Sequence, residues 1–187
     1  MPRLSKPDLL RQVEDAYRLG GWNVLYLSAL GEHPGRYRVY KDEVSETVRV
    51  YIWNVSHGGG AARSAAEYRI QITGLGSDQF AQEIGGKTLI LGYWPNEEVF
   101  AGFDYRRHSG HLGGSPSMQI GIAALRAAIT NGFATHRKNT GELAIAFRTD
   151  FMGTYTENLE ALHDTGTAPE ACLARPPGSR SGGCKRA

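Results

Sequence analysis

Apolar residues recur at helical spacing in three segments of the chain. The first lies between a Ser5 and Asp8 capping pattern and Gly20-Gly21, with an apolar face formed by Leu9, Leu10, Val13, Ala16 and Tyr17. In the second, Ser115-Pro116 has the form of a helix start with proline at the first helical position, and Gly132 marks the end. The spacing therefore predicts an N-terminal helix, a mid-chain helix near 116–131 and a C-terminal helix at about 150–163.

Shorter segments between these helices are typical of β-strands. Residues 22–28, 37–40 and 47–55 are rich in Tyr, Val, Ile and Trp and predict an antiparallel meander, while apolar and polar residues alternate along 66–73. Residues 87–94 and 99–105 predict a central hairpin around the turn 95–98, and 142–148 predicts a last strand. The order indicates an α+β fold with a mainly antiparallel sheet, partly open and barrel-like.

The size and composition fit one globular domain. The chain has 187 residues, of which 41% are hydrophobic and 21% charged, and we expect one domain over 1–163. Residues 164–187 are rich in Gly, Pro, Ser and Arg, which predicts a disordered basic tail. The two cysteines, Cys172 and Cys184, are too few for a disulfide framework or a four-cysteine zinc site. Since neither a signal peptide nor a run of about 18 apolar residues is visible, we expect a cytoplasmic protein with no membrane partner.

Positive charge is concentrated in one part of the chain. The formal net charge is only +2, but between Ala101 and Arg148 six basic residues accompany just two acidic ones, Asp104 and Glu142. The basic residues there are Arg106, Arg107, Arg126, Arg137, Lys138 and Arg148, and His108, His111 and His136 are nearby in sequence. This distribution points to a polyanionic partner.

The segment around 103–119 has the features of an anion-binding junction. A strand ends in Arg106, Arg107 and His108, a glycine loop follows, and Ser115-Pro116 begins the expected helix. Unpaired N–H groups in the first turn of a helix and flanking arginines would hold a phosphate. The alternative is that glycines serve the turn and arginines serve solubility, and the pattern leaves both open.

Catalytic and metal sites are poorly supported. The run His57-Gly58-Gly59-Gly60 lacks the Gly-Lys-Ser/Thr ending of a nucleotide-binding loop. His108 and His111 have a spacing that can bind zinc, and Asp104 and His57 are the other candidate ligands. However, no Cys or His pair lies close in sequence to complete the site. The sequences 67–69 and 104–106 only faintly resemble a nuclease carboxylate cluster. We therefore expect no catalytic centre, metal or cofactor, with a metal-dependent nuclease as the alternative.

Several segments together resemble a known family. They are 51–54 with 57–60, 67–74, 100–104, 112–119 and 144–148. These segments resemble the N-terminal recognition domain of bacterial HNH restriction endonucleases that act on modified DNA, some of which carry a DNA sulfur-binding domain. The resemblance covers residues 4–163 and implies binding to double-stranded DNA that carries a backbone or base modification. It also implies a nuclease partner or nuclease domain, and the residues after Asp164 lack the HNH motif.

The resemblance also implies site residues. A sulfur pocket for a phosphorothioate maps to Ser115, Pro116 and Ser117. Contacts to the DNA backbone or bases map to Arg63, Arg69, Gln71, Arg106, Arg107, His108, Gln119 and Lys138. The alternatives are a reader of unmodified sequence and a reader of a methylated base flipped among Trp53, Tyr68 or Trp94, although such aromatic residues more often belong to a core.

Overall fold

The structure is a computed structural model that describes residues 3–57 and 64–167. Its helices are α1 (Lys6–Leu19), α2 (Tyr105–His108), α3 (Ile122–Asn131), α4 (Met152–Glu157) and α5 (Leu159–Thr165), with a 3-10 turn at Thr149–Phe151. Its strands are β1 (Asn23–Tyr26), β2 (Gly35–Lys41), β3 (Val44–Asn54), β4 (Ser56–His57), β5 (Glu67–Gln71), β6 (Lys87–Trp94), β7 (Val99–Phe103), β8 (Ser117–Gly121), β9 (Phe133–Arg137) and β10 (Leu143–Arg148).

The described strands form two sheets. Seven are joined in the order β1-β2-β3-β6-β7-β10-β9, and β4-β5-β8 form a smaller sheet. Every pair is antiparallel except β3 and β6, which run parallel because the chain leaves the large sheet after β3 to build β4 and β5 before it returns as β6. The predicted α+β class, the meander of β1 to β3 and the central β6–β7 hairpin are confirmed. The described strands close no barrel.

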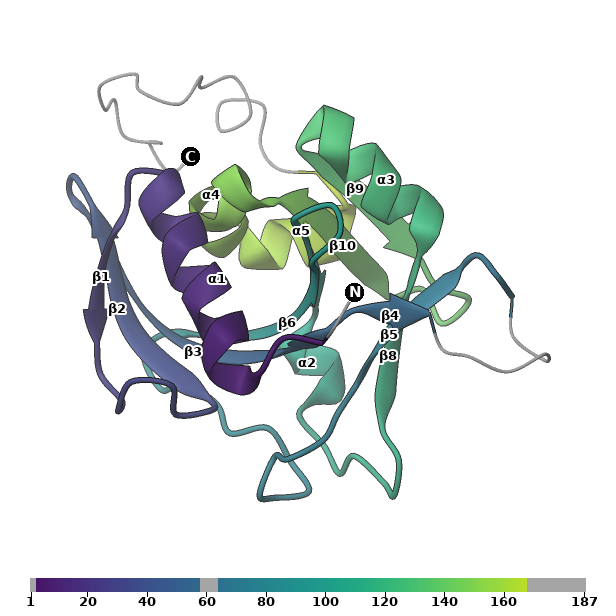
Figure 1. The fold of residues 1–187 in the computed structure, drawn as a ribbon, viewed down its shortest axis with the longest axis horizontal. Helices are drawn as coiled ribbons and strands as arrows, with labels where there is room; N and C mark the ends of the chain where they lie inside the picture. Colours follow the sequence, from purple (N-terminus) through teal and green to yellow (C-terminus); the bar gives the residue numbers. More distant parts are fainter. Residues whose placement is uncertain (1–2, 58–63, 168–187) are drawn as a thin grey trace.

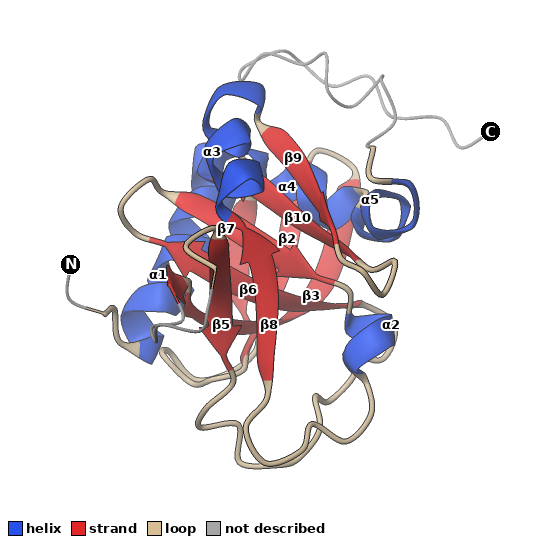
Figure 2. Cartoon of the chain, turned by 90° about the vertical axis from the view of Figure 1, so that its right-hand side faces the viewer, coloured by secondary structure: helices blue, strands red, loops and turns tan. Residues whose placement is uncertain are grey.

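The large sheet is covered on both faces (Figures 1 and 2). Helices α1, α4 and α5 pack on one face around an apolar cluster that includes Val50, Leu91 and Phe147. The small sheet and α3 cover the other face, where Ile70 and Met118 pack against strand residues of the large sheet. This layered packing fixes the small sheet, and the loops at its end, against a rigid support.

Helix α1 begins and ends as the sequence predicts. The Ser5 side chain accepts a hydrogen bond from the backbone N–H of Asp8 at 3.3 Å, which satisfies one of the free donors of the first turn. At the other end the N–H of Gly20 donates to the carbonyl of Ala16 at 3.1 Å. Local capping residues are sufficient to define this helix.

The predicted helix start at Ser115-Pro116 is wrong. Residues Ser117–Gly121 form strand β8, and α3 begins only at Ile122, after Gly121 in the N-cap position. Met118 and Ile120 are buried while Gln119 is exposed, so these residues follow the two-residue period of a strand, and β5 supplies a pairing partner from far away in sequence. Because helical and strand periods coincide at Met118 and Ile122, spacing alone could not separate them.

Smaller differences occur elsewhere. Strand β9 was not predicted, and the strand expected over 99–105 ends at Phe103 because Asp104 caps the single turn α2. The C-terminal helix is divided at Asn158 into α4 and α5, and α5 continues to Thr165, past the expected start of the tail. Cys172, Cys184 and most of the predicted tail lie outside the described residues. Within the described residues no helix has the length and apolar character needed to cross a membrane.

Candidate functional site

An open pocket of about 240 Å³ lies where α2 and the glycine loop meet the start of β8. It is lined by Arg107, His108, Gly110, His111, Leu112, Pro116, Ser117 and Met118. The lining joins one guanidinium and two imidazoles to the carbon surface of Leu112, Pro116 and Met118. The structure thus brings the predicted residues Arg107, His108, Pro116 and Ser117 together, although not at a helix N-terminus.

The turn α2 sends two neighbouring arginines to different surroundings. The Asp104 carboxylate accepts from the backbone N–H of Arg106 at 3.0 Å, and the Asp104 carbonyl accepts from the N–H of Arg107 at 3.1 Å. These two bonds fix a tight turn directly after the buried strand β7. Arg107 is exposed and lines the pocket, and its charge helps, after that of Arg106, to lower the pKa of Asp164, with which it forms no direct ion pair in the described chain.

Arg106 is held by two carboxylates. Its guanidinium donates to Asp104 through Nε and Nη2, both at 3.0 Å, and to Asp164 of α5 through Nη2 at 2.7 Å. Asp104 is buried, and its hydrogen bonds, followed by those of Asp164, raise the pKa of Arg106. Arg106, which the sequence predicts as a DNA contact, is therefore part of an ion-pair cluster that joins the end of β7 to α5.

His108 and Lys138 also share an internal carboxylate. The Oε1 atom of Glu142 lies 2.9 Å from His108 Nε2 and 2.9 Å from Lys138 Nζ. Burial raises the pKa of Glu142, but the hydrogen bond with His108 and the charge and hydrogen bond of Lys138 outweigh it and bring the pKa to about 2. Lys138 Nζ also lies 5.1 Å from the centre of the Phe103 ring. Lys138 thus serves the Glu142 cluster, and His108 joins that cluster to the pocket.

The apolar wall of the pocket is tied to the small sheet. The Pro116 carbonyl accepts from the N–H of Ile72 and from the Gln71 side chain, both at 3.0 Å. The Gln71 amide also donates to Ser115 Oγ at 3.3 Å. Gln71, predicted as a base-edge contact, therefore holds the Ser115-Pro116 segment in place, and proline presents ring carbons without an N–H donor.

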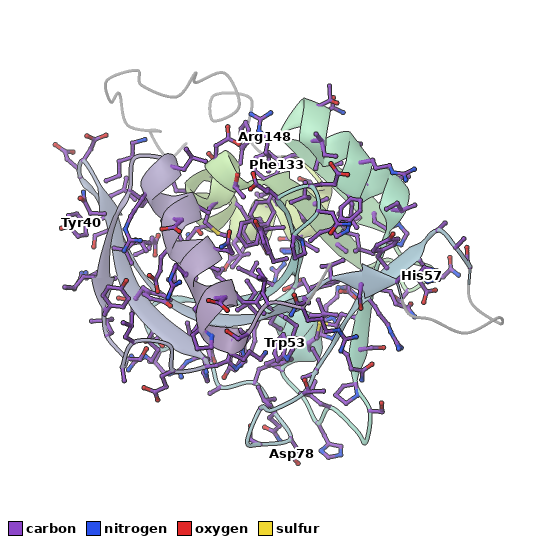
Figure 3. The ribbon with its side chains drawn as sticks, in the orientation of Figure 1. Tyr40, Trp53, His57, Asp78, Phe133 and Arg148 are labelled. Atoms are coloured by element: carbon purple, nitrogen blue, oxygen red, sulfur yellow. The ribbon has the colours of Figure 1, made fainter. Side chains whose placement is uncertain are left out.

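The glycine loop is fixed at its far end by Asp78. The Leu112 N–H donates to the Asp78 carbonyl at 2.9 Å, and His111 Nδ1 lies 2.8 Å from an Asp78 carboxylate oxygen. Figure 3 places Asp78 at the tip of the loops below the sheets. His108 and His111 consequently pair with different carboxylates, and no group of three His, Cys, Asp or Glu side chains in the described part of the chain could hold a metal ion.

A polar face of the small sheet adjoins the pocket. Arg69 of β5 is paired in register with Ser56 on one side and with Gln119 on the other, and Gln71 is paired with Ser117, which lines the pocket. Gln119 is exposed, while the opposite face buries Ile70 and Met118. Arg69 and Gln71 share one face, as the alternation in the sequence predicts, and Gln119 lies on the same face.

Other residues named from the sequence have different outcomes. Arg63 lies outside the described residues. Trp53 and Trp94 are buried, and Tyr68 packs edge-to-face on Trp94 with ring centres 5.4 Å apart, as expected of core aromatics. Leu112 and Met118 carry no signal in the sequence that marks them as pocket residues, because only the long-range pairing of β8 with β5 brings Met118 into one lining with Leu112 and Pro116.

Comparison with known proteins gives one match. Residues 46–156 match the family model described as methylase-associated X1. This range is more than half of the 187 residues and contains all residues that line the pocket. No curated protein and no solved structure matches the chain.

Proposed function

Because the chain belongs to the methylase-associated X1 family, we propose that it is the recognition module of a restriction–modification system and binds double-stranded DNA that carries a modification. The pocket formed by α2, the glycine loop and β8 carries this proposal. In this pocket the Arg107 guanidinium lies next to the carbon surface of Leu112, Pro116 and Met118. This combination suits a modified phosphate or base. A site for an unmodified anion usually has several cations and N–H donors.

A phosphorothioate fits this combination of groups. Its sulfur is larger and less strongly hydrated than the phosphate oxygen it replaces, so burying roughly 30 to 40 Å² of sulfur against Pro116 and Leu112 contributes about 1 kcal/mol. An oxygen buried there without a donor would cost about 1 to 3 kcal/mol. The resulting preference of roughly 2 to 4 kcal/mol corresponds to about 30-fold to 1,000-fold tighter binding of the sulfur form.

Arg107 and the small sheet supply the remaining DNA contacts in this proposal. Arg107 binds the charged backbone next to the mark, and His108 and His111 border the same phosphate. Gln119, with Arg69 beside it, faces a groove and contacts base edges, since a two-stranded β-ribbon fits the major groove. Arg106 and Lys138 maintain the shape of the site through Asp104 and Glu142.

A methylated base is the second candidate mark. The family description associates the domain with methylases, and the carbon surface of Leu112, Pro116 and Met118 would also receive a methyl group. The residues that line the pocket include no Phe, Tyr or Trp on which a flipped base could stack. A methyl group read from the groove is therefore the form of this alternative that the pocket favours.

The decisive experiment compares one duplex in three forms: unmodified, with a single phosphorothioate, and methylated. Fluorescence anisotropy titrations should give the tightest binding to the phosphorothioate form, and the affinity should fall steeply with salt, by a slope of about 0.9 in log K per neutralised phosphate. Arg107→Ala should weaken binding, whereas Arg126→Ala, which removes an exposed arginine of α3, is the matched control. Equal affinity for all three duplexes would refute a modification reader, and tighter binding of the methylated form would select the second candidate.

The proposal assigns no cleavage to this chain. Incubation of the three duplexes with the protein and Mg²⁺ or Mn²⁺ should leave all of them intact on a denaturing gel. Cleavage that survives repurification and follows the protein peak would contradict this part of the proposal and favour the metal-dependent nuclease alternative.

A further inference from the structure

One edge of the large sheet carries an uncharged segment. Strand β1 is the last strand on its side, and no described strand pairs with its outer edge. From Trp22 to Gly31 the chain has no charged residue. Proteins usually protect such an edge with charges, proline or a covering element, because its free N–H and C=O groups would otherwise pair with another chain.

Exposed apolar side chains gather around this edge. Eight large hydrophobic residues are exposed in the described part of the chain, and only Ile84 lies outside 19–44. The other seven, which we call the β1 edge patch, are Leu19, Leu25, Tyr26, Leu27, Leu30, Tyr40 and Val44. Leu30 is 79% exposed and Leu25 is 53% exposed. The patch also lies before residue 46, outside the part that matches the family model.

The opposite edge of the sheet is built differently. Strand β9 ends in His136 and Arg137, Lys138 follows, and α3 packs against the strand. None of its residues is among the exposed large hydrophobics of the described chain. The chain therefore protects one edge with charge and a helix, and leaves the other apolar.

We infer that the β1 edge patch is the interface of a two-fold dimer in which β1 pairs antiparallel with β1 of a second copy. A two-fold axis perpendicular to β1 places the strand antiparallel to its own copy, and an uncharged segment meets its copy without like-charge repulsion. Arg18, Glu32 and Arg38 border the segment and form a rim of both signs, which suits contact with an identical surface.

The exposed area of the β1 edge patch is close to that of one side of a stable dimer interface. At roughly 100 Å² of exposed surface for each of the seven side chains, the patch offers roughly 700 Å², close to the ~800 Å² per partner of a standard interface. Tyr40 projects from the β2 side of the molecule, well separated from Asp78 at the loops that hold the pocket (Figure 3). The dimer thus leaves both pockets accessible, and this inference stands independently of what the pockets bind.

Sedimentation equilibrium of the full chain tests the inference. Over roughly 1 to 100 μM, a range that covers micromolar dissociation constants, the average mass of the wild type should rise with concentration to twice the 20.4 kDa mass of one chain. Leu25→Lys and Leu30→Lys should each raise the dimer dissociation constant at least tenfold. Leu25→Lys places two like charges in β1 near the two-fold axis, and Leu30→Lys places a charge in the apolar part of the interface beyond the end of β1. Ile84→Lys, at an 83% exposed site away from β1, is the matched control and should stay dimeric.

Both lysine variants replace exposed side chains, so their circular dichroism spectra should match that of the wild type, which shows that they fold. A wild type that stays monomeric at all these concentrations would overturn the inference. Lysine variants that dimerise as tightly as the wild type, or open-ended oligomers in place of dimers, would overturn it as well.

Discussion

Arg106 and Arg107 are neighbours in sequence, yet they belong to two regions with opposite properties. Arg107 opens into the pocket, where its side chain has no described partner, whereas Arg106 is bound on two sides by Asp104 and Asp164. Behind the pocket, Glu142 likewise holds Lys138 and His108. The pocket is therefore suited to a ligand, and the two carboxylate clusters are suited to stability.

The number of basic residues in a segment therefore overestimates how many of them are available to bind a ligand. Of the basic residues predicted to contact DNA around α2 and β9, Arg106 and Lys138 are paired with carboxylates of the described chain, whereas Arg107 lines the pocket without such a pair. A pocket with one cation and much carbon surface distinguishes ligands of equal charge mainly by how much it costs to remove their water.

The largest expected effect is on stability, from Glu142→Gln. The Glu142 side chain is only 8% exposed, and the change leaves the ammonium of Lys138 without its counter-charge. We expect the variant to be about 2 to 3 kcal/mol less stable by urea denaturation, somewhat below the ~3–5 kcal/mol of a fully buried pair. Glu97→Gln in the exposed β6–β7 turn is the control and should stay within about 0.5 kcal/mol of wild type. If Glu142→Gln also changes the unfolding free energy by no more than about 0.5 kcal/mol, the cluster does not stabilise the fold.

Acid should weaken the same cluster. The folded-state pKa of Glu142 is about 2, below its ordinary value of 4.5, so the stabilisation is complete above pH 4.5 and is lost as the pH falls toward 2. We expect the stability difference between wild type and Glu142→Gln to shrink over this window, by about 2 kcal/mol or more. Urea titrations at pH 5, 4 and 3 measure it, and a difference that stays constant with pH would contradict the assigned ion pairs.

The two arginines should separate binding from folding. Arg107→Ala should weaken binding of the modified duplex about 10-fold to 100-fold, the loss of one charge-assisted hydrogen bond, while its unfolding free energy stays within about 0.5 kcal/mol of wild type. Arg106→Ala should lose about 1 to 2 kcal/mol of stability because buried Asp104 loses its partner, with affinity within about threefold. Loss of affinity in Arg106→Ala together with loss of stability in Arg107→Ala would contradict these assignments.

The smallest effect concerns discrimination within the pocket. Pro116→Ser retains the backbone carbonyl that Ile72 and Gln71 bind, but replaces ring carbons with a hydroxyl. The ratio of affinities for phosphorothioate and unmodified duplexes should fall about fivefold, which corresponds to about 1 kcal/mol, with little change for the unmodified duplex. Pro95→Ser in the β6–β7 turn should leave the ratio unchanged. An unchanged ratio in Pro116→Ser would exclude proline as the sulfur contact.

Much of the fold could be predicted because the signals are local. Ser5 and Gly20 define α1, and the turn 95–98 between two apolar runs defines the β6–β7 hairpin. The strand β8 could not be distinguished from a helix, because its identity depends on pairing with β5, some fifty residues earlier, and not on its own period.

The location of the candidate site could be predicted from the sequence, but which of its basic residues are paired with carboxylates could not. The residues Arg107, His108, Pro116 and Ser117 lie within one short segment, so the sequence brought them together without the fold. The partners that neutralise the other cations come from afar: Asp164 is 58 residues from Arg106, and Glu142 is 34 residues from His108. Only the fold brings Asp164 of α5, and Glu142 just before β10, next to the side chains of α2.

The most direct test of the central claim is to map where DNA binds the protein. Amide chemical shifts of the ¹⁵N-labelled chain, recorded during titration with a duplex that carries one phosphorothioate, should change most at Arg107 to Met118 and at Arg69 and Gln119 of the small sheet. Shifts at Asp164 and Lys138 should be small. Changes centred on Arg106, Asp164 and Lys138, with the pocket residues unaffected, would contradict the account.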